Sequence, residues 1–170
     1  MREWDRSALD GDVFRAVLGR FCSGVVIVTS GFDQEPIGMT AQSFSSLSLD
    51  PPLVLFCPSK TSTTWPKIRA TGKFCVNVLS EDQEGACRQF AVSGGDKFQG
   101  VVWWWSEDGM PALEGCLAHI KCSLDQVHDA GDHEIVVGRV TGLSLGHPER
   151  PLLFYQGAYR QLLHFDAAMS

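Results

Sequence analysis

The sequence lacks a long apolar stretch. Its apolar runs are short, as in residues 53–57, whereas a membrane-spanning helix needs about 18 or more such residues. The first ten residues mix Arg, Glu, Trp and Asp, and they do not have the charged-then-apolar pattern of a secretory signal. We therefore expect a cytoplasmic protein that does not enter a membrane.

Positive charge is also scarce. The chain of 170 residues has 14 lysines and arginines against 20 acidic residues, which gives a formal net charge of −6 at pH 7. A protein that wraps nucleic acid needs a basic face. We therefore expect no nucleic-acid partner.

Two motifs of metal and cofactor sites are missing. The cysteines, none of them in a CxxC pair, are Cys22, Cys57, Cys75, Cys87, Cys116 and Cys122. Structural zinc is therefore not expected. A chain of this length buries a core without cross-links, so we expect reduced and mostly buried thiols. No GxGxxG motif occurs, so any dinucleotide must bind otherwise than in a Rossmann fold.

The sequence does contain many short apolar segments. Strands are predicted at residues 25–29, 37–41, 44–49, 53–57, 74–78, 101–105, 116–127, 134–145 and 152–155. Helices are predicted at residues 64–70 and 81–90, and around a face shared by Val13, Phe14, Val17, Leu18 and Phe21. Asp10 or Asp12 can cap that first helix. Such spacing favours a barrel or sandwich over a doubly wound sheet. We expect one domain over residues 1–170, with a core of about 14–162.

Residues 59–64 form a run of hydroxyl side chains around Lys60, just before the helix predicted near Trp65. Helix N-termini have free N–H groups and attract phosphate. The same pattern is also typical of a simple N-cap on a solvated turn.

Residues 38–46 are also rich in hydroxyls but lie between strand-like segments. Small residues here, such as Gly38 and Ala41, allow a planar ring to approach the backbone. A polar edge strand explains the same composition.

His133 lies in a turn between two long predicted strands, next to Asp132 and Glu134. An imidazole can donate to a bound anion or carboxamide, and the two carboxylates can raise its pKa. The alternative is a solvated turn histidine. A metal site would need a third convergent ligand, and none is expected.

Three consecutive tryptophans, Trp103, Trp104 and Trp105, occupy one predicted strand. Side chains alternate across a strand, so at least one ring must find cover outside the local core. A dimer interface would provide that cover, and ordinary packing is the alternative.

Several stretches in their order resemble one known family. They are residues 21–29 (FCSGVVIVT), 38–52 (GMTAQSFSSLSLDPP), 74–79 (FCVNVL), 131–138 (GDHEIVVG) and 152–157 (LLFYQG). The chain resembles the flavin reductases with the FMN-binding split-barrel fold, which are the small components of two-component flavin-dependent monooxygenases. The resemblance implies a mainly β Greek-key split barrel with a few short helices, working as a homodimer.

The resemblance also implies a site. It places the flavin ring and ribityl chain against Met39, Thr40, Ala41, Gln42, Ser45 and Ser46, with Asn77 beside the ring or its tail. It places the flavin phosphate against Ser59, Lys60, Thr61, Ser62 and Thr64. The nicotinamide would dock at His133, in a pocket that Phe98 and Tyr159 line. The chain departs from common relatives at Gln42, at residues 57–58 and at residues 154–156.

The implied activity is reduction of FMN or FAD by NADH or NADPH, with a hydride passing from nicotinamide C4 to flavin N5. The reduced flavin then serves a partner monooxygenase. The residues leave the choice of flavin and of nicotinamide open. Two other readings also remain: an electron carrier or redox sensor with tightly held flavin, and a non-catalytic binding domain.

Overall fold

The computed structural model describes residues 10–162. Helices and strands follow in the order α1 (Gly11–Leu18), β1 (Ser23–Gly24), β2 (Val26–Phe32), β3 (Glu35–Ala41), β4 (Ser45–Leu49), β5 (Pro52–Phe56), α2 (Trp65–Thr71), β6 (Lys73–Val78), η1 (Glu81–Gln83), α3 (Glu84–Ala91), β7 (Trp103–Trp105), β8 (Pro111–Leu113), β9 (Ala118–Ala130), β10 (His133–Leu145), β11 (Leu153–Tyr155) and β12 (Ala158–Arg160). The mainly β prediction is confirmed. The predicted single domain reaches into residues 1–9 and 163–170, which lie outside the described residues, and its limits stay a prediction.

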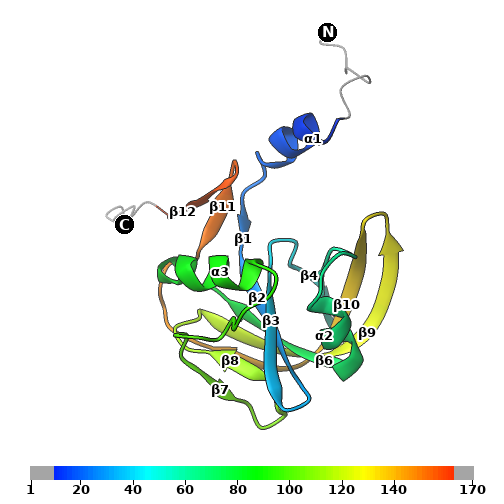
Figure 1. The fold of residues 1–170 in the computed structure, drawn as a ribbon, viewed down its shortest axis with the longest axis vertical. Coiled ribbons are helices and arrows are strands. Elements are labelled where there is room, and N and C mark those ends of the chain that lie inside the picture. The colour runs from blue at the N-terminus through cyan, green and yellow to red at the C-terminus, as the bar shows by residue number, and fades with distance from the viewer. Residues whose placement is uncertain (1–9, 163–170) are drawn as a thin grey trace.

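One antiparallel sheet of seven strands forms the body of the molecule, in the order β3-β2-β6-β9-β10-β5-β4 (Figure 1). Its two edge strands, β3 and β4, are joined by only residues 42–44. The sheet must therefore curve until its edges approach each other, as in a barrel. The split-barrel prediction is confirmed.

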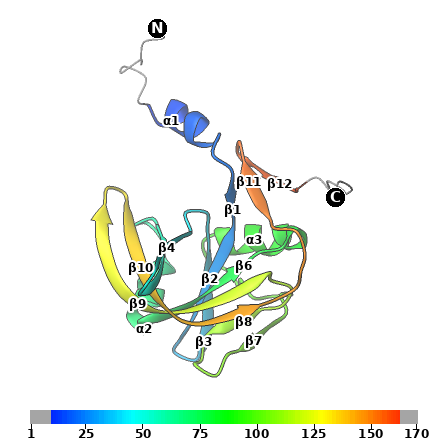
Figure 2. The same ribbon diagram turned by 180° about the vertical axis from the view of Figure 1, so that it is seen from behind.

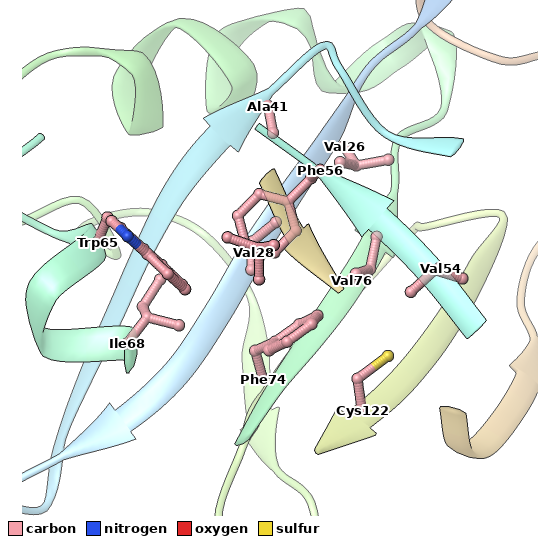
Figure 3. Packing of buried hydrophobic residues seen from close by; sticks show 11 residues of the cluster. Val26, Val28, Ala41, Val54, Phe56, Trp65, Ile68, Phe74, Val76 and Cys122 are labelled. Atoms are coloured by element: carbon pink, nitrogen blue, oxygen red, sulfur yellow. The ribbon is translucent and has the colours of Figure 1, made fainter. Parts of the chain in front are cut away.

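The first hydrophobic core fills the inside of the curved sheet (Figure 3). Phe56 lies at its centre and packs edge-on against Trp65 and Phe74, with ring centroids 5.6 and 5.3 Å away. Trp65 and Ile68 bring α2 into this core. Burial of these large rings fixes the start of α2, and therefore the segment that precedes it.

A second core lies on the other face of the sheet, under α3 and β7. Successive residues of a strand point to opposite faces, so Val26 and Val28 enter the first core while Val25 and Ile27 enter the second. Strand β6 is likewise covered on both sides. Phe74, Cys75, Val76 and Asn77 of this strand are all buried.

Helix α1 forms where the apolar spacing predicts it. Asp10 caps it, because its Oδ1 accepts hydrogen bonds from the N–H groups of Asp12 and Val13 at 3.0 and 2.8 Å. None of its residues is buried. The helix extends away from the barrel, beside β1 and the β11–β12 hairpin (Figure 2).

Some local features differ from the predictions. The predicted helix at residues 81–90 divides into the 3₁₀ turn η1 and α3, and strands β1, β8 and β12 were not predicted. Strands of two or three residues show no period, so pattern alone does not find them. Of the three tryptophans, Trp103 packs on Phe98 in the second core, and Trp104 and Trp105 are exposed.

In the described part of the chain, no helix has the length and apolar character that crossing a membrane requires. The cytoplasmic location stays a prediction.

Candidate active site

A cleft of about 450 Å³ opens along the end of edge strand β3 and the short link that follows it. We call it the main cleft. Its walls come from the end of β3, the segment after β5, the end of α3 and the start of β10. The lining residues are Met39, Thr40, Ala41, Gln42, Ser43, Cys57, Pro58, Ser59, Thr61, Ser62, Thr63, Thr64, Phe90, Ala91, Ser93, Lys97 and His133.

Residues 59–64, the hydroxyl loop, form one wall of the main cleft. Ser59 Oγ lies 2.9 Å from Thr61 Oγ1 and accepts a hydrogen bond from the Thr61 N–H. Ser62 Oγ accepts from the N–H groups of Thr64 and Trp65 at 3.3 and 3.1 Å. Ser62 therefore stabilises the turn that leads into α2, although the N-cap residue itself, Thr64, makes no side-chain cap hydrogen bond. The other hydroxyls of the loop line the cleft.

The tip of the β9–β10 hairpin holds the hydroxyl loop in place. The Lys60 N–H donates to the Asp132 carbonyl at 3.0 Å, and Ser59 and His133 pair as an isolated bridge. Lys60 Nζ forms an ion pair with Asp129 Oδ2 at 2.7 Å, which lowers the pKa of that carboxyl. The Lys60 ammonium is thus engaged on the hairpin, and Lys60 does not line the cleft as we had expected.

His133 lies at the end of the cleft formed by the hairpin. Its side chain is 44% exposed, and Nδ1 is 2.8 Å from Asp132 Oδ1. This contact lowers the pKa of Asp132, because the imidazole donates to the carboxylate. Glu134, which we expected to act on His133, instead accepts hydrogen bonds from Trp65 Nε1 and Arg69 Nη1. It joins the hairpin to α2.

Two hydroxyls near the edges of the sheet hold the walls of the cleft together. Thr40 Oγ1 donates to the Cys87 carbonyl at 2.7 Å, which ties β3 to α3. Ser43 Oγ accepts from the Cys57 N–H at 2.8 Å, which ties the link between β3 and β4 to the end of β5. A Cβ at Gly38 would lie 2.5 Å from the Phe90 ring, so only glycine lets α3 approach β3 this closely.

Lys97 provides a cation at the other end of the cleft, and the sequence did not indicate it. Its Nζ donates to the carbonyls of Gly38 and Phe90 at 3.2 and 3.1 Å, and lies 3.4 Å from Thr64 Oγ1. Partial burial lowers the pKa of this amine. Among the described residues Lys97 has no carboxylate partner. The one sequence feature that could have indicated Lys97 is its position just after the Gly94–Gly95 loop.

The structure brings most of the predicted site residues to the main cleft. They are Met39, Thr40, Ala41, Gln42, Ser59, Thr61, Ser62, Thr64 and His133. Ser45 lies instead in a neighbouring groove with Phe44 and Phe21, and Ser46 is exposed on β4. The turn to β4 carries both serines away from the cleft.

Three predicted residues lie in or against the second core. Phe98 is buried there and borders a neighbouring recess. Asn77 is completely buried, with Nδ2 donating to the Ile27 carbonyl and Oδ1 accepting from the Leu113 N–H. Tyr159 OH contacts Cys87 Sγ at 3.1 Å beneath α3, and burial raises the pKa of Tyr159 to about 12. We leave all three out of the proposed site.

The geometry agrees with what the chain resembles. A family model described as a flavin reductase like domain matches residues 18–163. The chain belongs to this family. It is 55% identical over 152 residues to the reductase subunit of a flavin-dependent monooxygenase from Rhodococcus jostii, a match covering 89% of this chain and 78% of that protein.

Two solved structures have the same fold. Nitrilotriacetate monooxygenase component B from Mycobacterium thermoresistibile superposes with a TM-score of 0.87 at 46% identity, covering 96% of this chain and 97% of the other. The NADH:FAD oxidoreductase of Streptomyces globisporus, in complex with NAD and FAD fragments, superposes with a TM-score of 0.88 at 38% identity, covering 98% and 99%. The predicted family, fold and oxidoreductase class are confirmed.

Proposed function

We propose that this protein transfers a hydride from NADH to a flavin nucleotide bound in the main cleft, and supplies the reduced flavin to a monooxygenase. The observation that carries the proposal is the cleft itself. In a chain of the flavin reductase family, it combines a hydroxyl-rich wall with a lysine that has no carboxylate partner among the described residues. The names of the matching reductase subunit and of the NADH:FAD oxidoreductase support the same activity.

The lining of the cleft fits a flavin nucleotide. Lys97 and Thr64 provide a cation and a hydroxyl for a phosphate at one end. Met39 and Cys57, which are partly exposed, provide apolar surface for a planar ring. The volume lies within the range of about 300–1,000 Å³ that is usual for small-molecule sites. We therefore place the phosphate at the Lys97 end and the ring toward the His133 end.

The chemistry requires little of the protein beyond positioning. When bound, a flavin accepts the hydride that the reduced nicotinamide donates. The hydroxyl loop and Lys97 would hold the nucleotide. His133 would orient the nicotinamide carboxamide so that the nicotinamide ring stacks on the flavin with the reacting atoms about 3–3.5 Å apart. The contact with Asp132 fixes the ring of His133 through Nδ1 and leaves Nε2 for the ligand.

We also propose that the protein is a homodimer in which α1 packs on a second copy. Phe14 and Val17 of α1 and Phe21 after it are more than half exposed, at 55%, 61% and 79%. A helix of this length is not stable in water without packing. Leu18 and Phe21 border a groove that Phe44 also lines, close to the main cleft. A two-fold dimer would let each α1 fill apolar surface on its partner.

The test is NADH oxidation by the purified protein with FMN, FAD or no flavin. We expect turnover that requires added flavin and saturates with it. A protein that keeps its flavin through gel filtration and oxidises NADH slowly would instead support the carrier or sensor. If neither flavin changes the rate of NADH oxidation, the remaining interpretation is a non-catalytic binding domain.

Two variants test the roles within the cleft. His133→Ala should lower turnover without abolishing it, since hydride transfer needs no protein base; unchanged steady-state constants would exclude this role.

Lys97→Met should weaken FMN binding about tenfold, a loss of the size expected for one charge-assisted contact, and leave riboflavin binding unchanged. Because the pKa of Lys97 is lowered, FMN binding should also weaken as the pH is raised toward that pKa, and this dependence should vanish in Lys97→Met.

A further inference from the structure

A separate pocket of about 170 Å³ lies between the two-stranded β7–β8 ribbon and the main sheet. We call it the Trp104 pocket. Trp104 and Ala112 line it from the ribbon, and His119 and Gly142 line it from β9 and β10. Gly142 has no side chain and Ala112 has a small one, so the ribbon and the sheet leave space between them. The pocket shares no lining residue with the main cleft.

The size and the walls of the Trp104 pocket suit one aromatic ring. An apolar cavity of about 150 Å³ in a protein can hold a benzene molecule. The indole of Trp104 is 44% exposed and gives the pocket an aromatic wall. It already lies edge-on to the imidazole of His119, with ring centroids 5.4 Å apart. A ligand ring can pack on the same indole at the spacings that aromatic pairs prefer.

His119 adds a hydrogen-bond acceptor to this lining. It is only 8% exposed, and its Nε2 lies 2.8 Å from the Leu113 carbonyl. A carbonyl can only accept, so Nε2 carries the proton and Nδ1 of the neutral imidazole has a lone pair. Among the described residues Nδ1 has no hydrogen-bond partner, and the fully enclosed side-chain atoms without a partner are Ser23 Oγ and Glu81 Oε2. Nδ1 therefore reaches open space, and the pocket is the space that His119 borders.

The other polar side chains of the pocket are already engaged. Lys121 Nζ forms an ion pair with Asp108 Oδ2 at 2.6 Å. Ser106 Oγ accepts a hydrogen bond from the Met110 N–H at 3.1 Å, and Ser144 Oγ donates to the carbonyl of the next residue at 3.3 Å. Because the charge of Lys121 is paired, the pocket favours a neutral ligand over an ion.

We propose that the Trp104 pocket binds a small neutral aromatic compound that carries one hydroxyl group and has the size of phenol. The ring packs against Trp104, and the hydroxyl donates to Nδ1 of His119. The inference does not depend on the proposed function, because the pocket and the main cleft are separate. Such a ligand and a flavin can therefore bind at the same time.

The test is a titration with phenol, followed through the indole N–H signals in ¹H–¹⁵N NMR spectra. We expect saturable binding with a dissociation constant of about 1 mM or lower, which is the range open to a ligand of this size. The Trp104 signal should shift as the site fills. The Trp105 signal should move far less, because Trp105 does not line the pocket.

A matched pair of variants locates the ligand. Trp104→Ala removes the aromatic wall and should weaken phenol binding about fivefold or more. Trp105→Ala is the control, because its ring is equally exposed, at 42% against 44%. It should change the affinity for phenol less than about twofold.

A third variant tests the acceptor. His119→Leu removes Nδ1, and the ratio of phenol affinity to toluene affinity should fall about fivefold, which is the size of one net hydrogen bond. The variant also leaves the Leu113 carbonyl without its donor, so circular dichroism is used to check its folding. If it does not fold, the matched tryptophan pair decides the inference.

Four results would overturn the inference. One is the absence of saturable phenol binding up to about 10 mM. The second is an equal loss of affinity in Trp104→Ala and Trp105→Ala. The third is an unchanged ratio of phenol to toluene affinity in folded His119→Leu. The fourth is displacement of phenol by FMN, which would place the phenol in the main cleft.

Discussion

Strand β2 and helix α1 are both rich in apolar residues, but their surroundings are opposite. Ile27 and Val28 in β2 are completely buried, whereas Phe14 and Val17 in α1 are more than half exposed. β2 lies between β3 and β6, with one core on each face. α1 extends away from the barrel (Figure 1).

The difference shows what an apolar pattern does and does not determine. Periodicity identifies the face that must leave water, because burial of apolar area is favourable wherever it occurs. It does not identify the partner that covers the face. For β2 that partner lies within the same chain, and for α1 we propose a second copy.

The largest effect should come from β2. Ile27→Ala deletes completely buried carbons from the second core, and we expect it to lower the free energy of unfolding by about 2–5 kcal/mol. Ile27→Val should cost about 0.5–1.5 kcal/mol. Guanidinium denaturation measures both, and the loss should not depend on protein concentration. A cost below about 1 kcal/mol for Ile27→Ala would mean that the site collapses around the deletion.

Charge on the apolar face of α1 should dissociate the proposed dimer and leave the barrel folded. Val17→Glu places a carboxylate in the proposed interface, and sedimentation equilibrium should then show monomers with an unchanged circular dichroism spectrum. Arg15→Ala is the control, because Arg15 pairs with Asp12 on the exposed side of the helix. A dimer that persists in Val17→Glu would place the interface elsewhere, with Trp104 and Trp105 the next candidates.

The smallest effect concerns the rate of thiol labelling. Burial raises the pKa values of Cys75, Cys116 and Cys122 to about 12, 11 and 12. A raised pKa means less thiolate at any given pH, so these thiols should label slowly at pH 8, together with the buried Cys87.

The other two thiols, Cys22 and Cys57, are not buried and should label quickly in the native protein. Raising the pH from 8 to 9 should leave the buried thiols slow. Cys22 lies just after α1, so its labelling should slow at protein concentrations that favour the dimer. Cys57 lines the main cleft and should be protected by bound flavin instead. If a higher protein concentration alone slowed the labelling of both Cys22 and Cys57, the assignment of these two thiols to different sites would be contradicted.

Much of the candidate site was predictable because it consists of neighbours in sequence. The hydroxyl loop and the end of β3 each place several cleft residues along one short segment, so locating the segment locates them. Asn77 shows where this fails. It lies on a predicted strand, but its amide is directed into the second core, where Nδ2 donates to Ile27 and Oδ1 accepts from Leu113. A motif gives the neighbourhood of a residue and not the direction of its side chain.

By itself the sequence determined the density of short strands, the capped α1 and the order of motifs that identifies the family. These are local properties, and they depend on residues a few positions apart. Only the tertiary structure decided which lysine serves the cleft. Lys60 lies in the hydroxyl loop but is neutralised by Asp129, 69 residues away. Lys97 lies outside that loop but reaches Gly38 and Thr64. Ion pairs and burial join residues far apart in the chain, so they exist only once the sheet has curved and brought those residues together.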